Sequence, residues 1–258
     1  MKIKQHLFKN LLEKLNKEQE CDEFKYIGTG NPFSNILIIG KEASIIKEKD
    51  EEQYKREILN NFSDWKNLKD FNSEKIKEKD WQYFSPLYPY KGQILKINNR
   101  KNDNNGTSKT WYNYQKLFNL IFNFPNNESI NFHENTFITE VNSTPSRKTA
   151  NAIINSIYFR KQNILSSKYF QSFPIVIISG VGYFENIKGK NEIEKIFKVN
   201  FTEKKFANKD KLSQPYWIHK SNDKIVINTN QLSIGISDTL LKEVANEINS
   251  FLKLKKLV

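Results

Sequence analysis

Polar side chains follow four hydrophobic stretches of the sequence, each at the point where a buried strand would end. They are Lys41 and Glu42, Glu140 and Asn142, the turn at 180–182, and the segment 228–233. Because the carboxyl ends of parallel strands open on the same edge of a sheet, we expect these groups to meet in one cleft. Two carboxylates beside a lysine are also groups that bind magnesium near a phosphate. Polar residues follow buried strands in any case, because the chain returns to solvent there, so the pattern alone leaves a functional and a purely structural interpretation open.

The elements that must position these groups are strands alternating with helices. Residues 36–39 are four aliphatic side chains in a row, which is typical of a strand buried on both faces. Residues 137–141 and 174–180 read as further strands, and 216–219 with 224–228 read as a hairpin that turns at 221–223.

Apolar residues at helical spacing predict the helices that cover this sheet. One lies within residues 1–20, and its apolar side is formed by Ile3, Leu7, Leu11, Leu12 and Leu15. A second is capped by Thr110, a third lies around 148–170, and the last is capped by Ser237 or Asp238. The expected fold is therefore α/β: a single domain over residues 1–258, its core at about 26–250, with a central, mainly parallel, four-stranded sheet between two helical layers.

The composition restricts the classes of partner and site. The formal net charge is +12, which favours an anionic partner such as nucleic acid. Cys21 is the single cysteine, and the three histidines show no metal-ligand spacing, so we expect no disulfide, metal or cofactor. We find no run long enough to span a membrane and no leader, which predicts a cytoplasmic protein.

The order of five segments resembles the uracil-DNA glycosylase superfamily. GTGNPFSNILIIGKEAS is similar to the family's first strand and its water-activating loop, often G-Q-D-P-Y or G-E-A-P-G. YFSPLYPYKG followed by TSKTWYNYQKLF resembles the base-stacking segment and the loop that pinches the DNA backbone. TFITEVN, IVIISGVGYF and IVINTNQLS resemble the base-reading strand, the next core strand, and the H-P-S-P-L-S loop.

This resemblance implies a role for each matching position. Glu42 would position water where the family has an aspartate, and Asn228 stands in place of the catalytic histidine. An amide can donate a hydrogen bond to a base but cannot carry charge, so the leaving group would be stabilised less. Lys41 and Phe84 would contact the base, and either Glu140 or Asn142 would read its edge. An ionised Glu140 only accepts hydrogen bonds and would suit an amino group such as that of cytosine or adenine.

The same resemblance places DNA contacts on the loops. These positions are Ser44, Lys109, Thr110, Gln231, Leu232 and Ser233, with Leu232 as the wedge that enters the duplex. The basic loop at 91–109 would lie along the duplex. Each position also has an ordinary interpretation: a surface Glu42 paired with Lys41, a core Leu232, or hydroxyls that stabilise turns.

Three functions remain open at this point. The first is a DNA-binding, base-flipping N-glycosylase that hydrolyses the glycosidic bond of a non-standard or modified base, in repair or in phage defence. The second is a protein that binds a nucleobase, a nucleotide or a nucleic acid in the same cleft without cutting it. The third is a metal-dependent nuclease that uses Glu42, Glu140 and Lys41. The oligomeric state is not predicted.

Overall fold

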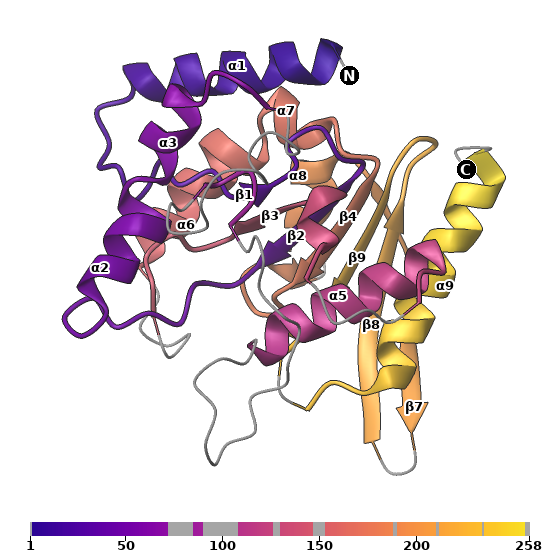
Figure 1. Cartoon of the computed structure of the whole chain (residues 1–258). Coiled ribbons are helices and arrows are strands. Elements are labelled where there is room, and N and C mark those ends of the chain that lie inside the picture. Colours follow the sequence, from indigo (N-terminus) through magenta and orange to yellow (C-terminus); the bar gives the residue numbers. More distant parts are fainter. Residues whose placement is uncertain are drawn as a thin grey trace.

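The computed structural model of the chain describes residues 2–71, 85–89, 108–125, 130–146, 153–187, 190–209, 212–233 and 235–255. A twisted sheet runs through the molecule, with helices on both of its faces (Figure 1). The predicted α/β class is therefore confirmed.

Seven strands form one sheet in the order β1-β3-β2-β4-β9-β8-β7. The strands β3, β2, β4 and β9 are parallel to one another, whereas β1, β8 and β7 are added antiparallel. The strand bounds are β1 Thr29–Gly30, β2 Ile36–Gly40, β3 Thr136–Glu140, β4 Ile175–Ser179, β7 Asn200–Lys209, β8 Leu212–Lys220 and β9 Ile225–Thr229, and a separate pair comprises β5 Asn186–Ile187 and β6 Lys190–Asn191. The expected parallel centre is present, but the sheet is larger than the four strands predicted.

Successive side chains of the parallel strands point to opposite faces and build two cores. On one face, Leu37, Val176 and Val226 pack with residues of α1, α3, α6, α7 and α8. On the other face, Ile38 and Ile177 pack with α5 and α9. Helices thus cover both faces of the sheet (Figure 1).

The helix bounds are α1 Lys2–Lys17, α2 Glu51–Tyr54, η1 Lys55–Leu59, α3 Asn61–Asn67, α5 Lys109–Phe122, η2 Phe132–Glu134, α6 Ile154–Phe159, η4 Arg160–Leu165, α7 Lys168–Gln171, α8 Glu192–Phe197 and α9 Asp238–Lys255.

Local chemistry explains where the long helices begin and which side they bury. The Ser108 hydroxyl accepts a hydrogen bond from the Trp111 N–H at 3.3 Å, so Ser108 caps α5 in place of the predicted Thr110. The Ser237 hydroxyl accepts from the Leu240 N–H at 3.1 Å and caps α9, as predicted. Helix α1 buries its apolar side as expected, except that Ile3 is 79% exposed.

A buried arginine ties the carboxyl end of β3 to the loop before β1. The guanidinium of Arg160 is fully buried and donates hydrogen bonds to the carbonyl oxygens of Glu140, at 2.8 Å, and of Tyr26. It also donates to the Thr139 hydroxyl at 2.7 Å. Three acceptors on two segments hold this edge of the sheet in one position, which is where the polar cleft forms.

Candidate functional site

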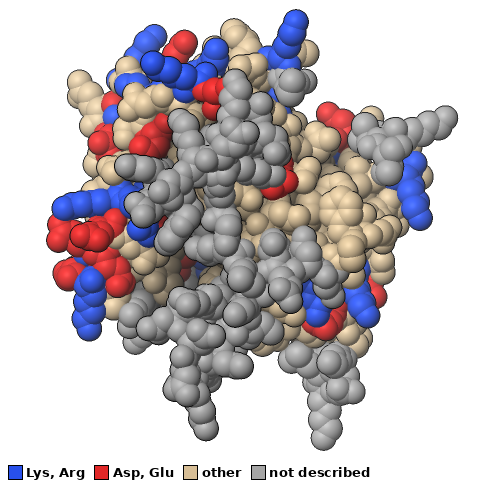
Figure 2. Space-filling view, in the orientation of Figure 1, with Lys and Arg blue, Asp and Glu red and all other residues tan. Residues whose placement is uncertain are grey.

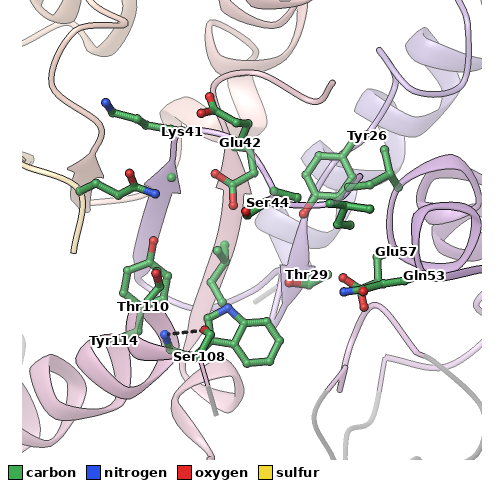
Figure 3. Close-up of a pocket in the computed structure, with 18 of the residues that line it drawn as sticks. Tyr26, Thr29, Lys41, Glu42, Ser44, Gln53, Glu57, Ser108, Thr110 and Tyr114 are labelled. Carbon is green, nitrogen blue, oxygen red and sulfur yellow. Dashed lines mark hydrogen bonds between the residues drawn. The ribbon is translucent and has the colours of Figure 1, made fainter. Parts of the chain in front are cut away.

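A pocket of about 520 Å³ opens at the carboxyl ends of β2 and β3. Figure 3 shows Lys41, Glu42 and Ser44 at the end of β2, Tyr114 and Thr110 from α5, and Tyr26, Gln53 and Glu57 on the opposite wall. The lining residues are Tyr26, Thr29, Gly40, Lys41, Glu42, Ala43, Ser44, Ile45, Gln53, Arg56, Glu57, Ile58, Ser108, Thr110, Trp111, Tyr114, Ile138, Glu140 and Gln231. Both predicted carboxylates line this one cavity, together with the predicted lysine.

Glu140 reaches the cavity because its neighbour on β2 has no side chain. Gly40 and Glu140 are partners in the parallel register, so both positions belong to the same face of the sheet. A Cβ atom on Gly40 would lie 2.8 Å from the carboxyl carbon of Glu140, which is closer than such atoms approach. The glycine therefore provides the space in which the Glu140 carboxyl group lies.

The surroundings of Glu140 favour its protonated form. Burial and, secondarily, the charge of Glu42 raise the pKa of this carboxyl group, and Arg160 lowers it; together they bring the pKa from 4.5 to about 8. Among the described residues, its Oε2 atom is buried and has no hydrogen-bond partner. At neutral pH most of the Glu140 carboxyl is protonated, so it can donate a hydrogen bond as well as accept one. The sequence interpretation considered only the ionised form of Glu140, whereas the raised pKa favours the protonated form.

Glu42 is held by a residue from a different strand end. The Tyr183 hydroxyl, in the loop after β4, donates a hydrogen bond to Oε2 of Glu42. The ammonium of Lys41 lies 5.8 Å from the centre of the Tyr183 ring. Gly180 allows this close packing, because a Cβ there would meet the Lys41 side chain at 3.3 Å. The turn at 180–182 thus contributes to the site by positioning Glu42.

Further lining residues, which the sequence analysis does not name, come from η1 and α5. Arg56 and Glu57 line the pocket from η1, a π-helical segment, and such segments are frequent at functional sites. Trp111 and Tyr114 lie in the first turns of α5, where the helix meets the cavity. Tyr114 also shares a hydrogen bond with Ser179 at the end of β4. Aromatic residues that closely follow a helix cap are the feature of the sequence from which this wall of the pocket could have been predicted.

Asn228 does not meet the two carboxylates. Its register partner on β4 is Ile178, which packs in the core on the α1 side, so Asn228 belongs to that face of the sheet. Thr229 is the residue of β9 on the α5 side, paired with Ser179. Asn228 is buried, and its Oδ1 atom has no hydrogen-bond partner among the described residues. The predicted convergence of Glu42, Glu140 and Asn228 in one pocket is therefore wrong for Asn228.

Two other predicted contacts are built into the interior. Asn142 is fully buried, and its side-chain oxygen accepts a hydrogen bond from the Thr144 N–H at 3.1 Å, which stabilises the turn after β3. Leu232 is fully buried in the core on the α5 side, and its N–H donates to the Ser179 hydroxyl at 2.7 Å. In this conformation the structure offers neither side chain to a ligand.

The other predicted DNA contacts divide between the pocket and its surroundings. Ser44, Thr110 and Gln231 line the cavity. Lys109 lies beside it in α5, with its ammonium 4.6 Å from the centre of the Tyr112 ring. Ser233 is partly buried, and its carbonyl oxygen accepts a hydrogen bond from the side chain of Asn113 at 2.9 Å. Phe84 and positions 91–107 of the basic loop lie outside the described residues.

Charge alone does not locate an interface. In Figure 2 the blue basic side chains are distributed around the rim of the visible face, several of them next to red acidic ones. Within the described ranges, no group of three or more histidine, cysteine, aspartate and glutamate side chains is arranged to hold a metal ion. No helix in the same ranges is long and apolar enough to cross a membrane.

Comparison with protein-family models gives no match for this chain, and comparison with curated proteins gives none either. The site must therefore be interpreted from its own geometry. That geometry is a polar cavity at the ends of two parallel strands, lined by the carboxyl groups of Glu42, Glu140 and Glu57 and by the aromatic rings of Tyr26, Trp111 and Tyr114.

Proposed function

We propose that this protein binds DNA and hydrolyses the N-glycosidic bond of a base that is rotated out of the nucleic acid into the cavity. The observation that carries the proposal is that Glu42 and Glu140 line the same pocket, while a buried oxygen of Glu140 has no hydrogen-bond partner among the residues that the structure describes. A pair of carboxyl groups, one of them with a raised pKa, is the usual arrangement for hydrolysis of a glycosidic bond.

The two carboxyl groups have complementary roles in the proposed reaction. Glu42 accepts a proton from water as the water oxygen bonds to C1′ of the sugar. The bond between C1′ and the base nitrogen breaks, and its electron pair leaves with the base. Glu140 reads the edge of the base and donates its proton to the departing group. Glu42 then holds a proton and Glu140 has lost one, and exchange with solvent restores both.

The remaining walls suit a planar base. Tyr26, Trp111 and Tyr114 are aromatic, and a cavity of about 520 Å³ lies within the range of small-molecule sites. Base-flipping enzymes read an extruded base by hydrogen bonds to its edge and by stacking on aromatic side chains. Lys41 in the lining offers positive charge for the phosphate that precedes or follows the extruded nucleotide, whereas Arg56 is paired with Glu57 at 3.2 Å.

The resemblance to the uracil-DNA glycosylase superfamily supports this proposal through the order of its motifs. The departure at Asn228 is explained if Glu140 stabilises the leaving base in place of the missing histidine. This assignment differs from the family pattern, in which a histidine from the H-P-S-P-L-S loop has that role. It also predicts that Asn228 is dispensable for the chemical step.

A second candidate function is binding of a nucleobase or nucleotide without hydrolysis. The observation in its favour is that Asn228 belongs to the opposite face of the sheet, so the pocket lacks the group expected from that loop. On this alternative, Glu42 and Glu140 only form hydrogen bonds to the ligand.

Release of free base decides between the two functions. The protein is incubated without added metal with DNAs that carry uracil, hypoxanthine, cytosine or modified cytosines, and the released base is detected by mass spectrometry. We expect release from one substrate and loss of release in Glu42→Gln and in Glu140→Gln. Glu13→Gln is the matched control, because Glu13 is an exposed carboxylate on α1 outside the cavity. Salt-dependent DNA binding without any release would overturn the enzymatic proposal and favour the binding function.

A further inference from the structure

The strands β7 and β8 form an arm that is longer than the strands of the parallel centre. β7 has 10 residues and β8 has 9, whereas β2, β3, β4 and β9 have 5 each. Figure 1 shows the arm extending beyond the rest of the sheet, with α9 alongside it. One face of the arm belongs to the core, because Ala207, Tyr216 and Ile218 pack with α5 and α9.

The opposite face of the arm is open. Lys204 pairs with Trp217 across the two strands, and Phe206 pairs with Pro215. Phe206 is 50% exposed, Lys204 is exposed, and Trp217 is partly buried. Among the described residues, the core on the α1 side of the sheet includes no residue of β7 or β8. We call Lys204, Phe206, Pro215 and Trp217 the arm face.

Positive charge lies directly among the rings of the arm face. The Lys204 ammonium is 4.8 Å from the centre of the Phe206 ring and 5.2 Å from that of Trp217. Glu203 is the one acidic residue in the sequences of β7 and β8, and it pairs with Ile218 on the α9 side. Near the start of β7, the Phe201 N–H donates a hydrogen bond to Glu194 of α8.

We propose that the arm face binds single-stranded nucleic acid, with bases stacked on Phe206 and Trp217 and Lys204 facing the phosphates. Aromatic side chains beside cationic ones on an open sheet are the arrangement that binds single strands without strong sequence preference. A purely apolar protein partner would bury the Lys204 ammonium without an anion, which is unfavourable. The formal net charge of +12 adds a general attraction for polyanions.

This inference shares with the proposed function only the assumption that the partner is a nucleic acid. The arm face is otherwise independent, because it contributes no residue to the lining of the cavity. It adds a second contact for the nucleic acid, separate from the cavity. The arm therefore affects affinity for the nucleic acid, and the carboxyl groups of the cavity affect the chemical step.

The test is binding of fluorescein-labelled oligothymidylate, measured by anisotropy at low and moderate potassium chloride. We expect Phe206→Ala and Trp217→Phe to weaken binding, the alanine variant by about five- to a hundredfold. Lys204→Ala should also weaken binding and lower its salt dependence. The matched controls are Phe124→Ala, whose ring is likewise 50% exposed but lies just after α5, and Lys242→Ala, an exposed lysine on α9.

Each result supports or overturns the inference. Loss of binding in the arm variants, with both controls unchanged and all variants melting at the wild-type temperature, supports it. Equal binding by arm variants and wild type overturns it, as does a wild type that binds no oligonucleotide. Sedimentation that shows a dimer dissociated by Phe206→Ala, without any effect on DNA, also overturns it and assigns the face to a second copy. Base release is measured on the same variants. Failure of the arm inference then appears as unchanged oligonucleotide binding, and failure of the proposed hydrolysis appears as absence of base release.

Discussion

The carboxyl group of Glu140 lies over Gly40, its partner in the parallel register between β3 and β2. This relationship brings a protonated acid to the edge of the cavity that Glu42 also lines. It makes Gly40, the last residue of β2, part of the candidate site, because a side chain there would occupy the space of the carboxyl group.

Gly40→Ala should displace the Glu140 carboxyl group and leave the sheet intact. Gly40 does not have a positive φ, so alanine fits its backbone conformation. Misplacement of a reacting group by about 1 Å costs roughly a hundredfold in rate, and we expect a loss of that order in base release. Single-turnover kinetics measure the effect, and thermal unfolding serves as the control. Wild-type rates in this variant would show that the position of Glu140 does not matter.

The pH dependence of stability should reveal the proton on Glu140. Its pKa is raised from 4.5 to about 8 in the folded protein, so between these values the folded state holds more protons than the unfolded state. The contribution of Glu140 to stability is therefore fully present below pH 4.5 and is lost as the pH rises towards 8. Glu140→Gln should remove this decline, a difference of roughly 1 kcal/mol per pH unit in urea unfolding. Parallel curves for the two proteins would contradict the assignment.

Activity should fall as the pH rises through about 8, because Glu140 then loses the proton that it donates. The rate of base release is measured from pH 6 to 9 under single-turnover conditions, and we expect a descending limb with a midpoint near 8. A rate that is constant over this range would exclude Glu140 as the proton donor.

Tyr183→Phe should lower kcat and leave KM nearly unchanged. The Tyr183 hydroxyl holds Oε2 of Glu42, and its removal frees the carboxylate to rotate away from the position in which the proposed reaction needs it. Loss of one such positioning hydrogen bond corresponds to about a tenfold fall in rate. Tyr158→Phe is the control, because Tyr158 is 65% exposed and does not line the cavity. An increase in KM alone would show that Tyr183 acts on binding instead.

Arg160→Lys should destabilise the fold, although it keeps the positive charge. The arginine donates to the carbonyl oxygens of Tyr26 and Glu140 and to the Thr139 hydroxyl, and lysine cannot reach all three acceptors. Each buried acceptor left without a donor costs about 1–3 kcal/mol. Urea unfolding measures the loss, and the same change at the exposed Arg56 is the control. A stability loss no larger than that of the control would contradict this role for Arg160.

Lys4→Met should change how stability responds to alkaline pH. The ammonium of Lys4 donates to the Ser34 carbonyl oxygen and lies 3.3 Å from the centre of the Phe173 ring. Burial, and secondarily Lys224, lowers the pKa of Lys4 from 10.5 to about 7. Between these values the unfolded state holds more protons, so this lysine makes stability increase with pH. We expect the increase from pH 7 to 9 to be smaller in the variant, as measured by urea unfolding. An identical increase in both proteins would show that Lys4 keeps its proton.

Much of the scaffold follows from local patterns in the sequence. The aliphatic runs ending at Gly40 and Ser179 are central parallel strands, and the apolar side of α1 docks through Phe8, Leu11 and Leu15. These features are predictable because a run of buried β-branched residues and a helical spacing of leucines each favour one local structure. The long strand β7 was not predicted. Its sequence, NFTEKKFANK, is mostly polar and lacks the regular alternation of apolar and polar residues that indicates a strand.

The candidate site was predictable only in part, and Glu140 and Asn228 show why. The sequence by itself determined that carboxylates and amides follow the parallel strands, because polar residues mark the points where buried strands end. Only the tertiary structure decided which of them share a cavity. Strand side chains alternate between faces, so the register that pairs Glu140 with Gly40 and Asn228 with Ile178 directs them to opposite sides of the sheet. The protonation of Glu140 likewise depends on burial and on Glu42, which lies almost a hundred residues away in the chain and comes close only on folding.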